Sequence, residues 1–209
     1  MTSFPSLSPA GERRQARLVD ARLQAVVDAS RPVGELERFA TAICGASVDV
    51  VRLHDETASE DALRTAADAL RRVCDRSGAL FVVDALPGLA LQVGADGVHV
   101  SRTDVHPDHA RRTVGPDLLV GRTAHTRGEY DRAADEDVDY VAVTRELAPH
   151  AAGHPHHPWF ADAGPDLTSA AAVLDRGARR LVADSCLRTA ADPAALCWAL
   201  RRALAAHLR

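Results

Sequence analysis

The stretch Gly78-Ala-Leu-Phe-Val-Val-Asp84 decides the fold, because the junction that it contains recurs along the chain. A glycine stands where a helical segment ends, since glycine suits the left-handed residue that closes a helix. A short apolar run follows, and a run that is apolar throughout is typical of a parallel strand buried on both faces. By this pattern we predict eight strands, at residues 17–20, 48–53, 79–84, 97–100, 118–121, 140–143, 158–161 and 180–183.

Segments with helical periodicity separate these strands. The clearest is 59–76, in which alanines, Leu70 and Val73 form one apolar stripe at helical spacing. The exception is 144–157, where two prolines, a glycine and four histidines disfavour a helix. Strands that alternate with helices in this way predict a closed (β/α)8 barrel, whose helix between strands six and seven is missing or reduced to a turn. Further helices are predicted at residues 35–44, 104–113, 126–136, 168–176 and 192–207.

Length and composition agree with one barrel and exclude other classes of protein. The 209 residues are enough for a single domain, in which we expect residues 1–14 to form a flexible N-terminal extension. The net charge of −4 gives no basic surface for nucleic acid, and no apolar run is long enough to span a membrane. The first nine residues lack the pattern of a secretory signal, and the four cysteines lack metal-ligand spacing. We therefore expect a cytoplasmic protein with a small-molecule substrate, able to form a homodimer.

Polar side chains follow almost every predicted strand. The carboxyl ends of barrel strands surround one mouth, and the chemistry of such barrels lies there. These side chains are therefore candidates for an active site. In chain order they are Arg52, His54, Asp84, Arg102, Asp104, Arg122, Thr123, His125, Thr144, Asp162, Asp184 and Ser185.

Two of these candidates, Asp84 and Asp104, follow neighbouring strands and predict a metal site. Carboxylates on adjacent strands can hold one Mg2+ ion that keeps several waters and meets the phosphates of a substrate. The alternative has equal weight. In it, Asp84 caps a loop, and Asp104 is the N-cap of a helix with Pro107 in its first turn.

Four segments, in order and at matching spacing, resemble the family of thiamine phosphate synthases and their thiazole tautomerase relatives. They are residues 78–104, the strand end Gly121-Arg-Thr-Ala-His125, residues 158–164, and residues 177–185 together with Ala191-Asp-Pro193. The resemblance extends from about Leu18 to Leu204. It implies a (β/α)8 barrel that joins a pyrimidine diphosphate to a thiazole phosphate and releases pyrophosphate.

The resemblance also implies roles for individual residues. Mg2+ is expected on Asp84 and Asp104, and basic side chains after strand two are expected to draw off the charge of the leaving group. The residues that receive catalytic roles are Arg52, His54, Thr123 and His125. Those expected to bind substrate are Arg102, Arg122, Thr144, Ala163, Gly164, Asp184 and Ser185.

The sequence departs from the family pattern where phosphate would bind. Residues 52–56 read Arg-Leu-His-Asp-Glu where the family has Gln-Leu-Arg-Glu-Lys, so His54 replaces an arginine and Glu56 replaces a lysine. A lysine-bearing loop after strand six is absent, and Asp162 and Asp184 add negative charge near the mouth. Because acids near a bound phosphate oppose its binding, we expect a diphosphate to bind weakly.

Three functions therefore remain open. The first is synthase-like transfer. The second is an isomerase or aromatase reaction in which His125 transfers a proton, although a packing role at the strand end is the favoured interpretation of this residue alone. The third is a barrel that binds a small molecule without turnover.

A histidine-rich segment follows strand six. Imidazoles in a flexible loop can gather Zn2+ or Ni2+. The irregular spacing and the lack of a nearby cysteine instead favour a solvated loop in which the histidines bind no metal. The residues concerned are His150, His154, His156 and His157.

Overall fold

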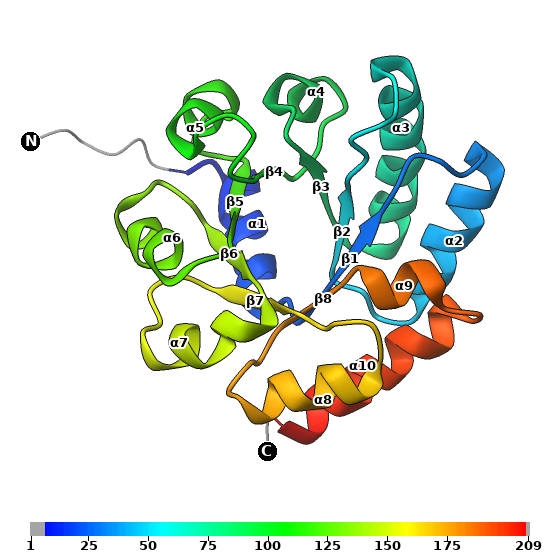
Figure 1. Ribbon diagram of the computed structural model, residues 1–209. Coiled ribbons are helices and arrows are strands. Elements are labelled where there is room, and N and C mark those ends of the chain that lie inside the picture. The colour runs from blue at the N-terminus through cyan, green and yellow to red at the C-terminus, as the bar shows by residue number, and fades with distance from the viewer. Residues whose placement is uncertain (1–6, 208–209) are drawn as a thin grey trace, which may run out of the picture.

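Eight parallel strands close into a barrel in the computed structural model, which describes residues 7–207. Each strand pairs with the next along the chain, and β8 pairs with β1, so the ring is complete (Figure 1). This confirms the predicted (β/α)8 barrel. The strands are β1 (Leu23–Val27), β2 (Val50–Leu53), β3 (Leu80–Asp84), β4 (Gly97–Val100), β5 (Leu119–Ala124), β6 (Tyr140–Val143), β7 (Trp159–Asp162) and β8 (Leu181–Ala183).

Helices cover the outside of the ring (Figure 1). The longest, α3 (Glu60–Ser77), begins after Ser59, whose side chain accepts a hydrogen bond from the Ala62 N–H, and ends at Gly78, which has a φ of 76°. No helix within residues 7–207 has the length and apolar character needed to cross a membrane. The other helices are α1 (Pro9–Asp20), α2 (Val33–Gly45), α4 (Pro87–Gln92), α5 (Pro107–Val114), α6 (Arg127–Arg132), α7 (Ala148–Gly153), α8 (Leu167–Asp175), α9 (Ser185–Thr189) and α10 (Pro193–His207), with 3-10 turns η1 (Ala133–Asp135) and η2 (Arg145–Leu147).

The first predicted strand is wrong, because residues 17–20 belong to α1 and β1 follows them. Ser8 caps this helix by accepting a hydrogen bond from a backbone N–H, and Leu18 is its buried large apolar side chain. When only residues 17–20 are considered, an apolar pair between charged residues has the pattern of a short strand, although it belongs to a helix. The helix also contains residues 9–14, which corrects the expected flexible extension. Residues 1–6 of that extension lie outside the described part of the chain.

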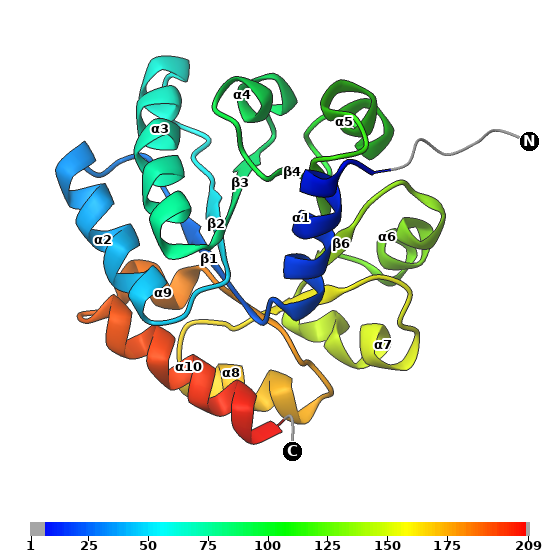
Figure 2. The ribbon, with the colours of Figure 1, turned by 180° about the vertical axis from the view of Figure 1, so that it is seen from behind.

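Helix α1 lies across the amino-terminal end of the barrel, as the reverse view in Figure 2 shows. Arg14 Nε lies 3.1 Å from Oδ1 of Asp96, which directly precedes β4. Oδ2 of the same carboxylate accepts the Phe81 N–H at 2.9 Å and lies 2.8 Å from Arg71 Nη1. The carboxylate therefore joins α1, α3 and the start of β3.

The helix between β6 and β7, predicted to be missing or reduced to a turn, is short: residues 144–157 contain the turn η2 and the six residues of α7. Pro149 stands in the first turn of α7, where its missing N–H costs no helical hydrogen bond, and Gly153 is the last helical residue. The hydroxyl of Tyr130 donates to the His154 carbonyl at 3.2 Å beyond this end. Proline and glycine therefore mark the two ends of a short helix instead of preventing it.

Side chains along each strand alternate between the barrel interior and the surrounding helices. Apolar side chains such as Leu80 and Phe160 fill the interior. At the carboxyl ends of the strands, polar side chains replace them, with Arg52 on β2, Asp84 on β3 and His99 on β4. The polar side chains of the interior are therefore concentrated at the mouth of the barrel.

Candidate active site

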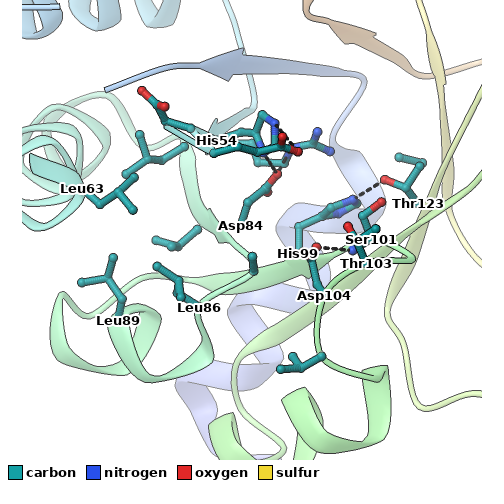
Figure 3. Close-up of a pocket in the computed structure, with 18 of the residues that line it drawn as sticks. His54, Leu63, Asp84, Leu86, Leu89, His99, Ser101, Thr103, Asp104 and Thr123 are labelled. Atoms are coloured by element: carbon teal, nitrogen blue, oxygen red, sulfur yellow. Dashed lines mark hydrogen bonds and ion pairs between the residues drawn. The ribbon is translucent and has the colours of Figure 1, made fainter. Parts of the chain in front are cut away.

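A cavity of about 910 Å³ opens at the carboxyl ends of the strands (Figure 3). Its volume is within the range of small-molecule sites. Leu63, Leu86 and Leu89 form an apolar wall, opposite the polar side chains of β3 to β5. The predicted site residues that line the cavity are Arg52, His54, Asp84, Asp104, Thr123, His125, Thr144, Asp162 and Asp184.

Asp84, at the end of β3, lies between two basic side chains. Arg52 Nε is 3.2 Å from Asp84 Oδ1, and His54 Nδ1 is 2.8 Å from Oδ2. Although burial favours the neutral acid, the charge of Arg52 and the hydrogen bond from His54 hold the pKa of Asp84 below its usual range. The same hydrogen bond raises the pKa of His54. The carboxylate is therefore ionised, and its charge is partly balanced by protein groups.

His99 is a site residue that the sequence analysis missed. It is 1% exposed, and Nε2 lies 2.8 Å from Thr123 Oγ1 while Nδ1 lies 3.1 Å from the Tyr140 hydroxyl. Burial and the charge of Arg52 lower the pKa of His99 to about 3, so the ring is neutral near pH 7. The sequence contains no direct signal for this residue, because its place next to Asp84 depends on the register of β4 against β3.

Asp104 lies in the loop between β4 and α5, and its side chain closes that loop. Its Oδ2 accepts the Ser101 N–H at 2.6 Å, an interaction that Figure 3 shows beside the cavity. The N-cap of α5 is His106, so the alternative in which Asp104 caps this helix is wrong. Asp104 and Asp84 line the same cavity from neighbouring strand ends.

Arg122 does not line the cavity, which corrects its predicted contact with substrate. Because Thr123 lines the cavity, the alternation of β5 turns Arg122 outward, where it forms an ion pair with Glu136. Arg102 is also outside the lining. Its side chain is 73% exposed, and Nη1 lies 3.9 Å from a carboxylate oxygen of Glu129. Neither guanidinium replaces the cations that the sequence lacks at the mouth.

The loops after β7 and β8 present carboxylates to the cavity. Asp162 lines it and accepts the Gly164 N–H at 3.0 Å, while Gly164 turns the chain with a φ of 78°. Asp184 also lines it and lies 2.8 Å from Arg188 Nη1. The residues of these loops that were predicted to bind substrate but lie outside the lining are Ala163, Gly164 and Ser185.

Carboxylates outnumber basic side chains along the cavity. Arg52 is the only arginine among the described residues that line it, and the chain has no lysine. Such a lining favours neutral or cationic ligands, and it disfavours an anion unless a metal ion accompanies that anion. The lining carboxylates are Asp55, Glu56, Glu60, Asp84, Asp104, Asp162 and Asp184.

The histidine-rich segment lies outside the cavity lining and forms α7 and the residues after it. His150 Nε2 lies 2.6 Å from Asp131 Oδ1, and the His150 ring stacks on that of His154. His157 bonds a backbone carbonyl through Nε2. Within residues 7–207, no group of three or more side chains is arranged to hold a metal ion.

Comparison of this sequence with known proteins identifies the family to which the chain belongs. The model of the family described as thiamine monophosphate synthase matches residues 23–148. A thiamine-phosphate synthase from Mycobacterium tuberculosis is 34% identical, with 92% of this chain and 98% of the relative covered. One from Saccharopolyspora erythraea is also 34% identical, with 96% and 100% covered. The chain belongs to the thiamine monophosphate synthase family.

Solved structures share the fold of this member of the thiamine monophosphate synthase family. A thiamine phosphate pyrophosphorylase from Pyrococcus furiosus superimposes with a TM-score of 0.80 at 21% identity, covering 93% of this chain and 99% of its own. A 3-hexulose-6-phosphate synthase from Salmonella typhimurium gives 0.69 at 14% identity, covering 89% and 99%. At these identities the likeness extends to the barrel alone.

Proposed function

We propose that the protein is a synthase-like transferase that couples a pyrimidine diphosphate to a thiazole phosphate and releases pyrophosphate. One observation carries this proposal: Asp84 and Asp104 line a single cavity at the carboxyl ends of the strands. The cavity is large enough for two small heterocycles, and the wall of Leu63, Leu86 and Leu89 offers apolar surface to their rings. Family membership supports this reaction class.

The two carboxylates fit a Mg2+ ion. Asp84 Oδ1 is buried 3.2 Å from Arg52 Nε but accepts no hydrogen bond of adequate geometry within the described chain, so it keeps a lone pair for a metal ion. Mg2+ needs only one or two carboxylates when waters and substrate phosphates complete its shell. Asp84 and Asp104 would hold the ion, which when bound would supply positive charge against the departing pyrophosphate.

The chain's own cations provide the rest of the positive charge. The Arg52 guanidinium is buried beside the cavity, and its Nη1 has no hydrogen-bond partner among the described residues. His54 has a raised pKa because of its hydrogen bond to Asp84, so its protonated form adds charge on the same side. These two groups can draw off negative charge as the bond to the pyrimidine carbon breaks.

The acidic lining predicts that this transfer is slow. Glu56 is 83% exposed at the mouth, and its Oε1 lies 4.0 Å from His54 Nε2, so it opposes an approaching anion. A charge-assisted phosphate contact contributes roughly 1.5–3 kcal/mol, so losing two such contacts weakens binding by about two orders of magnitude or more. We therefore expect turnover that depends strongly on Mg2+ and has a high KM for the diphosphate.

An isomerase reaction at His125 is the second candidate. His125 lines the cavity, and its side chain has no hydrogen-bond partner within residues 7–207. An imidazole that faces a ligand can move a proton to and from a heterocycle. The substitution His125→Asn tests this role, because it keeps polarity and removes proton transfer.

A steady-state assay with the pyrimidine diphosphate, the thiazole phosphate and Mg2+ tests the proposed function. Formation of thiamine phosphate that stops when Mg2+ is chelated supports transfer. Proton exchange on a thiazole without coupling, lost in His125→Asn, would replace transfer with isomerisation. Binding without either reaction would indicate a barrel that only binds a small molecule.

A further inference from the structure

A buried hydrogen-bonded row connects the barrel interior to the cavity. The Tyr140 hydroxyl lies 3.1 Å from His99 Nδ1, and His99 Nε2 lies 2.8 Å from Thr123 Oγ1. Tyr140 and His99 are each 1% exposed, whereas Thr123 lines the cavity beside His99 (Figure 3). Gly121 makes room for the tyrosine, since a Cβ there would lie 2.1 Å from Tyr140 Cζ.

The direction of the hydrogen bonds in this row follows from counting protons. No carboxylate contacts a ring nitrogen of His99, so the fully buried ring is neutral and carries one N–H. If that N–H were on Nδ1, it would donate to Tyr140, and the tyrosine proton would need another acceptor. The buried Gln24 amide also reaches the Tyr140 hydroxyl and acts on its oxygen as a hydrogen-bond donor, so His99 Nδ1 is the acceptor left for the tyrosine proton. A buried O–H without an acceptor is costly, so Tyr140 donates to Nδ1.

The direction of these hydrogen bonds determines which atom of Thr123 can bond a ligand in the cavity. With Nδ1 accepting, the proton of His99 is on Nε2 and is donated to Thr123 Oγ1. The threonine proton is then not used by the histidine, and it is available to an oxygen atom of a ligand. We propose that Tyr140 holds His99 in its Nε2–H tautomer, and that His99 thereby makes the Thr123 hydroxyl a hydrogen-bond donor toward an anionic ligand group. Tyr140 and His99 are positioning residues in this arrangement.

The tautomer can be measured without any ligand. Long-range ¹H–¹⁵N correlation spectra of the ¹⁵N-labelled protein separate the protonated from the unprotonated ring nitrogen, and His99→Gln identifies the His99 signals. We expect Nε2 protonated in the wild type. In Tyr140→Phe the Nδ1 resonance should move toward that of an unbonded nitrogen. A protonated Nδ1 in the wild type, or an unchanged Nδ1 resonance in Tyr140→Phe, would overturn the proposal.

The donor role of Thr123 needs a ligand and so rests on the proposed function. Thiazole phosphate is titrated calorimetrically in the presence of Mg2+. Thr123→Val keeps the shape and removes the hydroxyl, and it should weaken binding by roughly tenfold to a hundredfold. Thr123→Ser should restore binding to within about threefold, and His99→Gln should retain it because the amide nitrogen can replace Nε2 as donor.

The tautomer measurement and the binding measurement can contradict the proposal independently of each other. Equal binding by Thr123→Val and wild type would overturn the donor role while leaving the synthase assay unaffected. If the wild type does not bind thiazole phosphate, the proposed function fails. A protonated Nε2 that responds to Tyr140→Phe would then still support the tautomer assignment.

Discussion

The Nδ1 atom of His54 lies 2.8 Å from Oδ2 of Asp84, at the position where the family pattern has a permanent arginine. The histidine keeps a hydrogen bond to the carboxylate that is expected to hold Mg2+, but its charge depends on protonation. Arg52, which replaces a glutamine of that pattern, lies 3.2 Å from the other carboxylate oxygen. Both basic side chains therefore contact Asp84, whereas the exposed side chain beside them at the mouth is the acidic Glu56.

Asp84→Asn should destabilise the fold. Arg52 and Asp84 side chains are each 11% exposed, and removing one member of a buried pair leaves the other charge unbalanced. We expect a loss of roughly 3 kcal/mol in the free energy of unfolding, measured by urea denaturation. Asp104→Asn is the matched variant, because an amide oxygen can still accept the Ser101 N–H, and it should cost less than about 0.5 kcal/mol. Equal losses in the two variants would contradict this account.

The neutral state of His99 predicts a pH dependence of stability. The folded pKa is about 3 and the ordinary value is 6.5, so between these values the unfolded chain binds a proton that the folded protein excludes. The contribution is complete above pH 6.5 and is lost as the pH falls. Relative to His99→Gln, which cannot titrate, the wild type should lose about 1.6 kcal/mol between pH 6.5 and 5. A difference that does not change with pH would show that His99 titrates normally.

Asp96→Ala should be strongly destabilising, because this carboxylate contacts Arg14, Arg71 and the Phe81 N–H below the barrel. We expect a loss of roughly 3 kcal/mol in chemical denaturation. Asp68→Ala, on the exposed face of α3, is the control and should leave stability within about 0.5 kcal/mol. A mild effect of Asp96→Ala would mean that α1 is held to the barrel by other contacts.

Gly121→Ala tests the packing of Tyr140 inside the barrel. The added Cβ would lie 2.1 Å from the tyrosine ring, so the ring must move and its hydrogen bond to His99 must lengthen. We expect a loss of roughly 1–3 kcal/mol in melting experiments. Gly128→Ala places its Cβ 3.5 Å from a flexible arginine on α6 and should be neutral or slightly stabilising. Equal losses of stability in Gly121→Ala and Gly128→Ala would contradict the close approach of Tyr140 to Gly121 on β5.

The repeated glycine-to-strand junction was sufficient to predict the closed barrel and seven of its strands, because both-face burial makes each strand apolar throughout. The first strand was misplaced. Leu18 and Val19 stand between charged residues like a short strand, whereas the true strand Leu23–Val27 contains Gln24, a polar residue inside the barrel. Whether a short apolar run is a strand or one face of a helix depends on contacts distant in sequence.

The site was predictable at the strand ends and less so within the strands. Thr123 and His125 line the cavity as expected, but Arg122 between them faces outward, and strict alternation along β5 would have indicated this. His99 required the register of β4 against β3, which the sequence does not contain. The ion pair of Asp84 with Arg52 likewise depends on two strands meeting side by side.

Steady-state coupling by the wild type and by Glu56→Lys tests the central claim most directly. Glu56 is exposed at the mouth, so the substitution restores a cation with little effect on folding, and Glu12→Lys makes the same change of charge on α1 at the opposite end of the barrel. The account predicts slow, Mg2+-dependent thiamine phosphate formation by the wild type. It predicts a kcat/KM for the pyrimidine diphosphate about tenfold higher in Glu56→Lys and unchanged in Glu12→Lys. No turnover by folded wild type and Glu56→Lys, or equal kcat/KM in all three proteins, would contradict it.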